Sequence, residues 1–120
     1  MPKNNSKVVV YEKPTCSKCR DLKRVLTEKG VEFETVNYIE NPLAAADLKR
    51  LLKQAGLKPS EVLRTKEDSY REYVAGKNLG DDELLAVMAK HPELIQRPIV
   101  VRGEKAVLAR EIEKLRDLNI

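Results

Sequence analysis

The chain has 120 residues, of which 42% are hydrophobic and 35% are charged. This size and composition predict one globular domain over residues 1–120, large enough to bury a core without a disulfide or a metal. The net charge of +4 comes from interspersed basic and acidic residues, which favours anionic partners only modestly. No basic stripe predicts direct binding to nucleic acid.

The sequence carries no signal for export or for membrane insertion. Residues 1–7 are polar, and the apolar run at residues 8–10 is too short for a signal peptide or a transmembrane helix. We therefore expect a cytoplasmic protein with no membrane partner. In that compartment, Cys16 and Cys19 are catalytic residues or metal ligands more often than a structural disulfide.

The first part of the chain predicts a strand, a helix and a second strand. Residues 1–6 are expected to be a frayed tail. Residues 7–11 form a β-branched apolar run typical of a buried strand, and residues 12–15 a loop. A helix is predicted from Ser17 to Lys29, with Gly30 ending it. The apolar face of that helix consists of Cys19, Leu22, Val25 and Leu26. Residues 32–38 alternate as a second strand, and the helical crossover makes the two strands parallel.

The rest of the chain predicts a helical block and then a hairpin. Asn41-Pro42 resembles an N-cap with a first-turn proline, opening a helix that ends at Gly56. Residues 58–63 suggest a further helical turn, and the polar residues 64–79 show no clear pattern. Asp81 or Asp82 is predicted to cap the next helix. The chain then gives strands at 98–101 and 105–108, joined at Gly103, and a final helix at 111–118.

This order predicts an α/β protein of thioredoxin- and glutaredoxin-like fold. One four-stranded mixed sheet holds a parallel pair followed by an antiparallel pair. The helical block, at about residues 43–95, is an insertion between the βαβ and ββα halves.

The strongest chemical signal is Cys16-Ser17-Lys18-Cys19, which follows a predicted strand and opens a predicted helix. A tetrahedral zinc site needs four ligands, and the chain offers only these two cysteines and the distant His91. This context favours a redox motif with no bound metal.

The start of a helix should favour a thiolate at Cys16. Unpaired N–H groups and the helix dipole create positive potential there, which Lys13, Lys18 and Arg20 reinforce. The pKa of Cys16 should therefore fall below its ordinary value, and the same N–H groups could bind an oxyanion. Cys19, one turn later, either resolves an adduct on Cys16 or is a small buried hydrophobe, and the sequence leaves both open.

A second signal is Arg97-Pro98, directly before the third predicted strand. In thioredoxin-like proteins a proline at this place is cis and faces the cysteine loop. That fold therefore predicts a cis bond here and an Arg97 side chain that projects toward Cys16.

Four segments resemble the glutaredoxin-coupled arsenate reductase family, and the resemblance runs from about residue 7 to residue 118. The segments are residues 9–20, 38–42 (Tyr-Ile-Glu-Asn-Pro), 63–65 (Leu-Arg-Thr) and 91–101 (His-Pro-Glu-Leu-Ile-Gln-Arg-Pro-Ile-Val-Val). Regulators of the Spx type are close relatives that share the fold and the Cys-x-x-Cys motif.

The resemblance implies a catalytic thiol and three arginines around an oxyanion. Cys16 matches the cysteine that attacks arsenate, and the arginines that hold the anion match Arg64, Arg97 and Arg110. No cofactor is implied. The electron donor would be glutathione or another external thiol, with glutaredoxin as partner, unless Cys19 supplies the second thiol.

Three positions differ from the family pattern. Cys19 is one, because a second cysteine is typical of the Spx-type regulators and many of the arsenate reductases have none there. Glu12 stands where the arsenate reductases often carry a histidine, and an inward carboxylate there would oppose thiolate formation. Glu111 replaces the proline that usually follows the third arginine, and it could pair with Arg110.

Two other functions are compatible with the sequence. One is a regulator that binds RNA polymerase and uses Cys16 and Cys19 as a redox switch. The other is a general disulfide reductase. The three arginines favour the arsenate-reductase-like enzyme.

Overall fold

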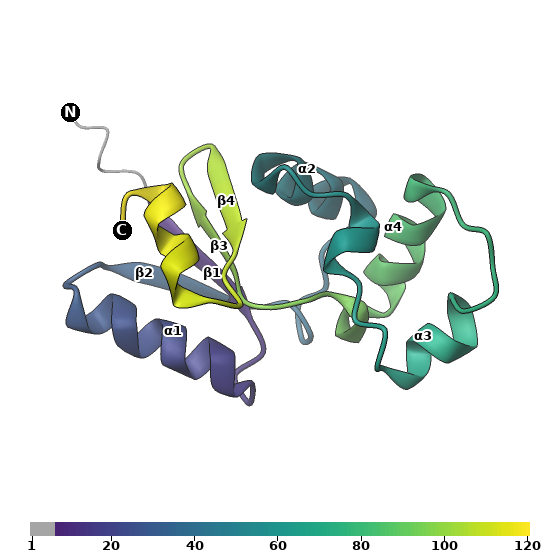
Figure 1. The fold of residues 1–120 in the computed structure, drawn as a ribbon, viewed down its shortest axis with the longest axis horizontal. Coiled ribbons are helices and arrows are strands. Elements are labelled where there is room, and N and C mark those ends of the chain that lie inside the picture. The colour runs from purple at the N-terminus through teal and green to yellow at the C-terminus, as the bar shows by residue number, and fades with distance from the viewer. Residues whose placement is uncertain (1–6) are drawn as a thin grey trace.

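The structure is a computed structural model and describes residues 7–120, so the tail expected at residues 1–6 lies outside it. Its core is a four-stranded mixed sheet of order β2-β1-β3-β4 (Figure 1). The strands are β1 (Val8–Glu12), β2 (Phe33–Asn37), β3 (Ile99–Arg102) and β4 (Lys105–Leu108). β1 runs parallel to β2 and antiparallel to β3, and β3 and β4 form the hairpin. The predicted fold class is confirmed.

Helix α1 (Ser17–Glu28) and the 3-10 helix η4 (Ile112–Leu118) cover one face of the sheet. Val8 and Val10 of β1 pack there against Leu22 and Leu26 of α1. The alternation along β1 places every second side chain on this face. Glu12, the last residue of β1, therefore follows Val8 and Val10 toward α1.

The opposite side of the sheet carries the helical segment between β2 and β3, which Figure 1 shows gathered at one end of the molecule. Helices α2 (Ala45–Ala55) and α4 (Asp81–Lys90) bury their leucines in a second apolar cluster with Tyr38 and Ile99. The shorter elements are η2 (Pro59–Val62), α3 (Asp68–Tyr73) and η3 (Pro92–Leu94). The segment lies within the range predicted for the insertion, and its assignment to one domain with the sheet stays a prediction. Within residues 7–120, no helix combines the length and apolarity needed to cross a membrane.

Several predicted element boundaries were wrong. The Asn41 N–H donates to the Asn37 carbonyl at 2.9 Å, so this stretch is a turn. Helix α2 begins only at Ala45, and its N-cap residue makes no side-chain hydrogen bond. The N-cap of α4 is Gly80, whose N–H donates to the Glu83 carboxylate at 3.0 Å, so both candidate aspartates lie inside the first turn.

Leu22 offers a direct test of the packing between α1 and the sheet, because its side chain is fully buried. Replacing Leu22 with alanine should lower the free energy of unfolding by about 2–5 kcal/mol, since a cavity remains. The neighbouring exposed Asp21, replaced with alanine, should change it by less than about 0.5 kcal/mol. Urea denaturation of both variants measures the difference, and equal effects would contradict this packing.

Candidate active site

Cys16 is the N-cap residue of α1, with extended backbone, and its N–H donates to the Lys13 carbonyl at 2.9 Å. This tight turn joins β1 to α1 and leaves the Cys16 side chain partly exposed. Cys19, one turn into the helix, is completely buried on the face that it shares with Leu22. Both cysteines are free thiols.

The surroundings of Cys16 favour its thiolate. Burial of the sulfur opposes ionisation, but four donors outweigh it and set the pKa of Cys16 below its ordinary value. These donors are the backbone N–H groups of Cys19 and Lys18, the Cys19 thiol and the Arg97 guanidinium. The direction agrees with the prediction from the sequence, and Arg97 projects to Cys16 as expected.

Cys19 has the opposite character. Burial, the thiolate next to it and the Glu12 carboxylate raise the pKa of Cys19 to about 11, although the backbone N–H of Lys13 acts against them. At neutral pH, Cys19 is therefore a thiol that donates its proton toward the Cys16 sulfur. The pair therefore consists of a more acidic attacker, whose thiolate is stabilised, and a protonated neighbour.

Arg97 lies behind the cysteine turn and is only 6% exposed. The Arg97-Pro98 peptide bond is cis, as predicted. Burial disfavours the charged guanidinium, but interactions with Tyr38 and with the Cys16 thiolate raise its pKa above the ordinary value. Its Nε is buried and lacks a hydrogen-bond partner among residues 7–120. An anion in this place would satisfy that donor.

Tyr38, immediately after β2, holds Arg97 in place. Its hydroxyl donates to the Ile95 carbonyl at 2.6 Å and accepts from Arg97 Nη1 at 3.4 Å. Burial raises the pKa of Tyr38 to about 12, and the charges that act on it include those of Arg97, Cys19 and Arg64. The phenol therefore lies near the Arg97 and Arg64 guanidinium groups and the Cys19 side chain.

The other two predicted arginines reach the same segment as Arg97. Arg110 Nη1 donates to the Arg97 carbonyl at 2.7 Å, and within residues 7–120 no ion pair joins it to Glu111. Arg64 Nη1 contacts the Gln96 side chain at 3.4 Å, while its Nε pairs with Glu67 at 3.1 Å. An anion that bound Arg64 would therefore compete with Glu67 for this side chain.

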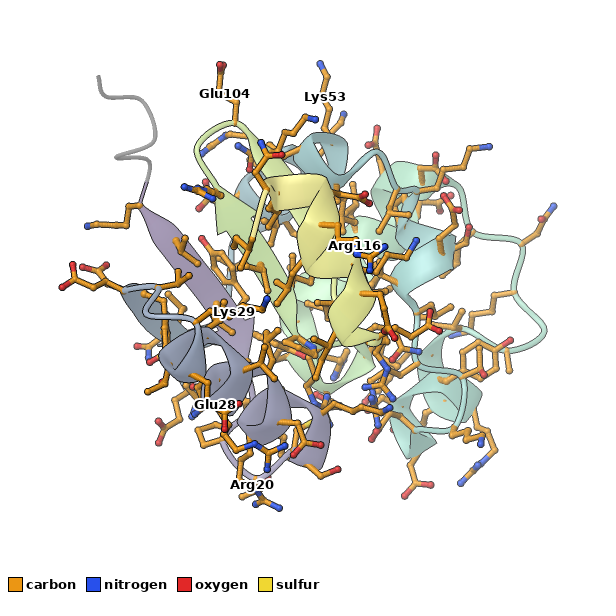
Figure 2. All side chains as sticks on the ribbon, turned by 60° about the vertical axis from the view of Figure 1, so that its left-hand side comes forward. Arg20, Glu28, Lys29, Lys53, Glu104 and Arg116 are labelled. Atoms are coloured by element: carbon orange, nitrogen blue, oxygen red, sulfur yellow. The ribbon has the colours of Figure 1, made fainter. Side chains whose placement is uncertain are left out.

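The cationic side chains next to the cysteines in sequence are not among the largest influences on the pKa of Cys16. Lys18 and Arg20 are exposed on α1, and Figure 2 shows Arg20 extending outward from the helix into solvent. Arg97 is the cationic side chain that appears among the largest influences on the pKa of Cys16.

Glu12 faces inward, which is the orientation in which its carboxylate would oppose thiolate formation. It is 3% exposed and pairs with Lys23 Nζ, which lies 2.8 Å from one carboxylate oxygen and 3.2 Å from the other. The paired cation offsets part of its charge, and its negative potential acts on Cys19. Within residues 7–120, no group of three His, Cys, Asp or Glu side chains is placed to hold a metal ion.

Sequence reasoning missed Tyr38 and placed Glu12 in a loop. A tyrosine that ends a strand before a turn is a signal, because a buried hydroxyl needs a partner. The inward direction of Glu12 follows from extending the alternation of Val8 and Val10 by two residues. The partners of both side chains come from segments distant in the chain.

Replacing Tyr38 with phenylalanine should destabilise the protein by about 1–3 kcal/mol, because it leaves the Ile95 carbonyl and an Arg97 donor unsatisfied. Arg97 should also become less ordered, which would weaken anion binding. The exposed Tyr73, replaced with phenylalanine, is the control, since its ring stacks on His91 without being buried. Urea denaturation measures the difference, and equal stability of the two variants would show that the Tyr38 hydroxyl is not a structural link.

A mixed sheet of order β2-β1-β3-β4, a Cys-x-x-Cys turn opening α1 and a cis-proline before β3 define a thioredoxin-like α/β protein. The solved arsenate reductase from Vibrio cholerae has this fold, with a TM-score of 0.88 and 39% identity over 95% of this chain and 98% of that one.

The chain belongs to the ArsC family, whose model matches residues 11–118. It is 34% identical over 110 residues to an arsenate reductase from Neisseria meningitidis, covering 90% of this chain and 94% of the relative. It is also 41% identical over 113 residues to the uncharacterized protein YfgD from Escherichia coli, covering 92% of this chain and 95% of that protein.

Proposed function

We propose that this protein is a cytoplasmic, thiol-dependent oxidoreductase that reduces arsenate or a related oxidant through the Cys16 thiolate. The observation that carries the proposal is the buried Arg97 guanidinium, which stabilises this thiolate and has an unsatisfied Nε. Arg64 and Arg110, which reach the same segment, would complete the neutralisation of the oxyanion.

The reaction begins when the thiolate attacks arsenic. A sulfur–arsenic bond forms and hydroxide leaves, taking a proton to become water. A second thiol then attacks the Cys16 sulfur, forming a disulfide, and the sulfur–arsenic electron pair stays on arsenic as arsenite. Two thiols are oxidised while arsenic(V) becomes arsenic(III).

The second thiol is glutathione, with glutaredoxin completing the cycle, or Cys19. The relatives called arsenate reductases support the substrate class. No bound cofactor enters this scheme.

The test is arsenate reduction with glutathione and glutaredoxin, with arsenite as the measured product. We expect turnover by the wild type. Activity that survives Cys19→Ser would identify the external thiol as the resolving group in this assay. An inactive wild type would contradict the proposal and leave the polymerase-binding regulator and the disulfide reductase as alternatives.

A further inference from the structure

Glu12 is one of two charged residues buried in the described chain, together with Arg97. Arg97 has a role at the Cys16 sulfur, while the scheme above does not use Glu12. A buried carboxylate is costly to keep, so its place beside the cysteine pair calls for an explanation.

The position of Glu12 is fixed from two sides. The alternation of β1 turns its side chain toward α1, behind the buried Val8 and Val10. Lys23 forms an ion pair with the carboxylate, with Nζ 2.8 Å from the nearer oxygen. Lys23 is four residues after Cys19, so both side chains leave α1 on the same face, one turn apart.

Cys19 also lies against the backbone next to Glu12. The N–H of Lys13, the residue that follows Glu12, points to the Cys19 sulfur. The charged or titratable groups near Cys19 include Glu12 from β1, Cys16 and Lys23 from α1, and Tyr38 from the end of β2. Of these, Cys16 is the proton acceptor in the resting protein.

That acceptor disappears during the reaction. Once Cys16 carries an adduct, its sulfur is no longer an anion, and the Cys19 proton has lost its partner. Cys19 attacks only as a thiolate, so its proton must leave. The remaining anion near this sulfur is the Glu12 carboxylate.

We propose that Glu12 accepts the proton of Cys19 when Cys19 attacks an adduct on Cys16. The step rests on the proposed redox function of Cys16. The Cys19–Cys16 sulfur–sulfur bond forms, the bond from Cys16 to its adduct breaks, and the electron pair leaves with the released group. The proton moves to Glu12, and Lys23 holds the carboxylate in position for it.

An aromatic disulfide tests this step without arsenate, glutathione or glutaredoxin. Cys16 attacks 5,5′-dithiobis(2-nitrobenzoate) and releases one coloured thiolate, at a rate proportional to reagent concentration. Cys19 then displaces the second coloured thiolate, at a rate independent of reagent concentration. Stopped-flow absorbance separates the two phases.

For Glu12→Gln we expect the first phase to persist and the second to slow by about 10–100-fold near neutral pH, the range of general-base catalysis. The wild-type second phase should depend weakly on pH. In Glu12→Gln the rate of the second phase should rise about tenfold per pH unit, because only the small thiolate fraction of Cys19 then reacts. Glu12→Asp should restore part of the rate, and the exposed Glu34→Gln should match the wild type.

Two results would overturn the proposal. One is a wild type without a second phase. The other is a Glu12→Gln second phase with wild-type rate and pH dependence. A failure of arsenate reduction in the separate assay would reject the proposed substrate, but it would not change the conclusion drawn from the second phase of Glu12→Gln.

Discussion

Replacing Cys16 with serine is expected to reduce arsenate reduction to the background rate, a loss of more than about a thousand-fold. Serine keeps the size of the side chain and its place before α1, but its hydroxyl stays protonated at neutral pH and cannot form the disulfide through which two thiols reduce arsenic. The measurement is arsenite formation with glutathione and glutaredoxin in excess.

The fold should survive this change, because Cys16 is partly exposed and outside both apolar clusters. An unchanged urea midpoint therefore serves as the control. Retained turnover in Cys16→Ser would show that another group attacks the substrate, and the assignment of the nucleophile would be wrong.

Replacing Arg97 with glutamine should lower kcat/KM for arsenate by about 10²–10³-fold, the usual effect of losing one preorganised donor. The change removes a buried cation that stabilises the thiolate and whose Nε lacks a hydrogen-bond partner among residues 7–120. The pKa of Cys16 should rise, because one of the groups that favours its ionised form is lost. The alkylation rate of Cys16 by iodoacetamide should therefore reach half its maximum at a higher pH than in the wild type.

The matched control is Arg116→Gln, which removes an exposed arginine on η4 (Figure 2) and should leave both measurements unchanged. Arg97→Lys keeps the charge but not the planar donors. Its kcat/KM and its alkylation midpoint should lie between those of Arg97→Gln and those of the control. An Arg97→Gln protein with wild-type kcat/KM and an unshifted alkylation profile would contradict the role of Arg97 at the thiolate.

The elements with a clear hydrophobic period were predictable from the sequence. The buried face of α1, with Cys19, Leu22 and Leu26, follows from helical spacing. Helix α2 ends at Gly56 as predicted, and the structure shows that residue in the left-handed conformation. Helix α3 could not be predicted, because none of its six residues is buried and only Tyr70 packs, partly buried, against the second apolar cluster. The true start of α2 was obscured by Asn41-Pro42, which mimics a cap while forming a turn with Asn37.

The candidate site was predictable where local sequence determines the chemistry. Cys16 sits before a helix because the strand–turn–helix pattern places it there. The partners of the arginines depend on tertiary contacts that no local pattern encodes. Two examples are the ion pair between Arg64 and Glu67 and the hydrogen bond that Arg110 donates to the Arg97 carbonyl. The pairing of Glu12 with Lys23, eleven residues apart, belongs to the same class.

The most direct test of this account is a titration of the Cys16 thiolate by its absorbance at about 240 nm, with Cys16→Ser subtracted as the reference. The subtraction removes Cys19 and the tyrosines. We expect a midpoint below the ordinary cysteine value of about 8.5, because the start of α1, the Cys19 thiol and Arg97 stabilise the anion. A midpoint at or above that value would contradict the claim that this turn creates a reactive thiolate.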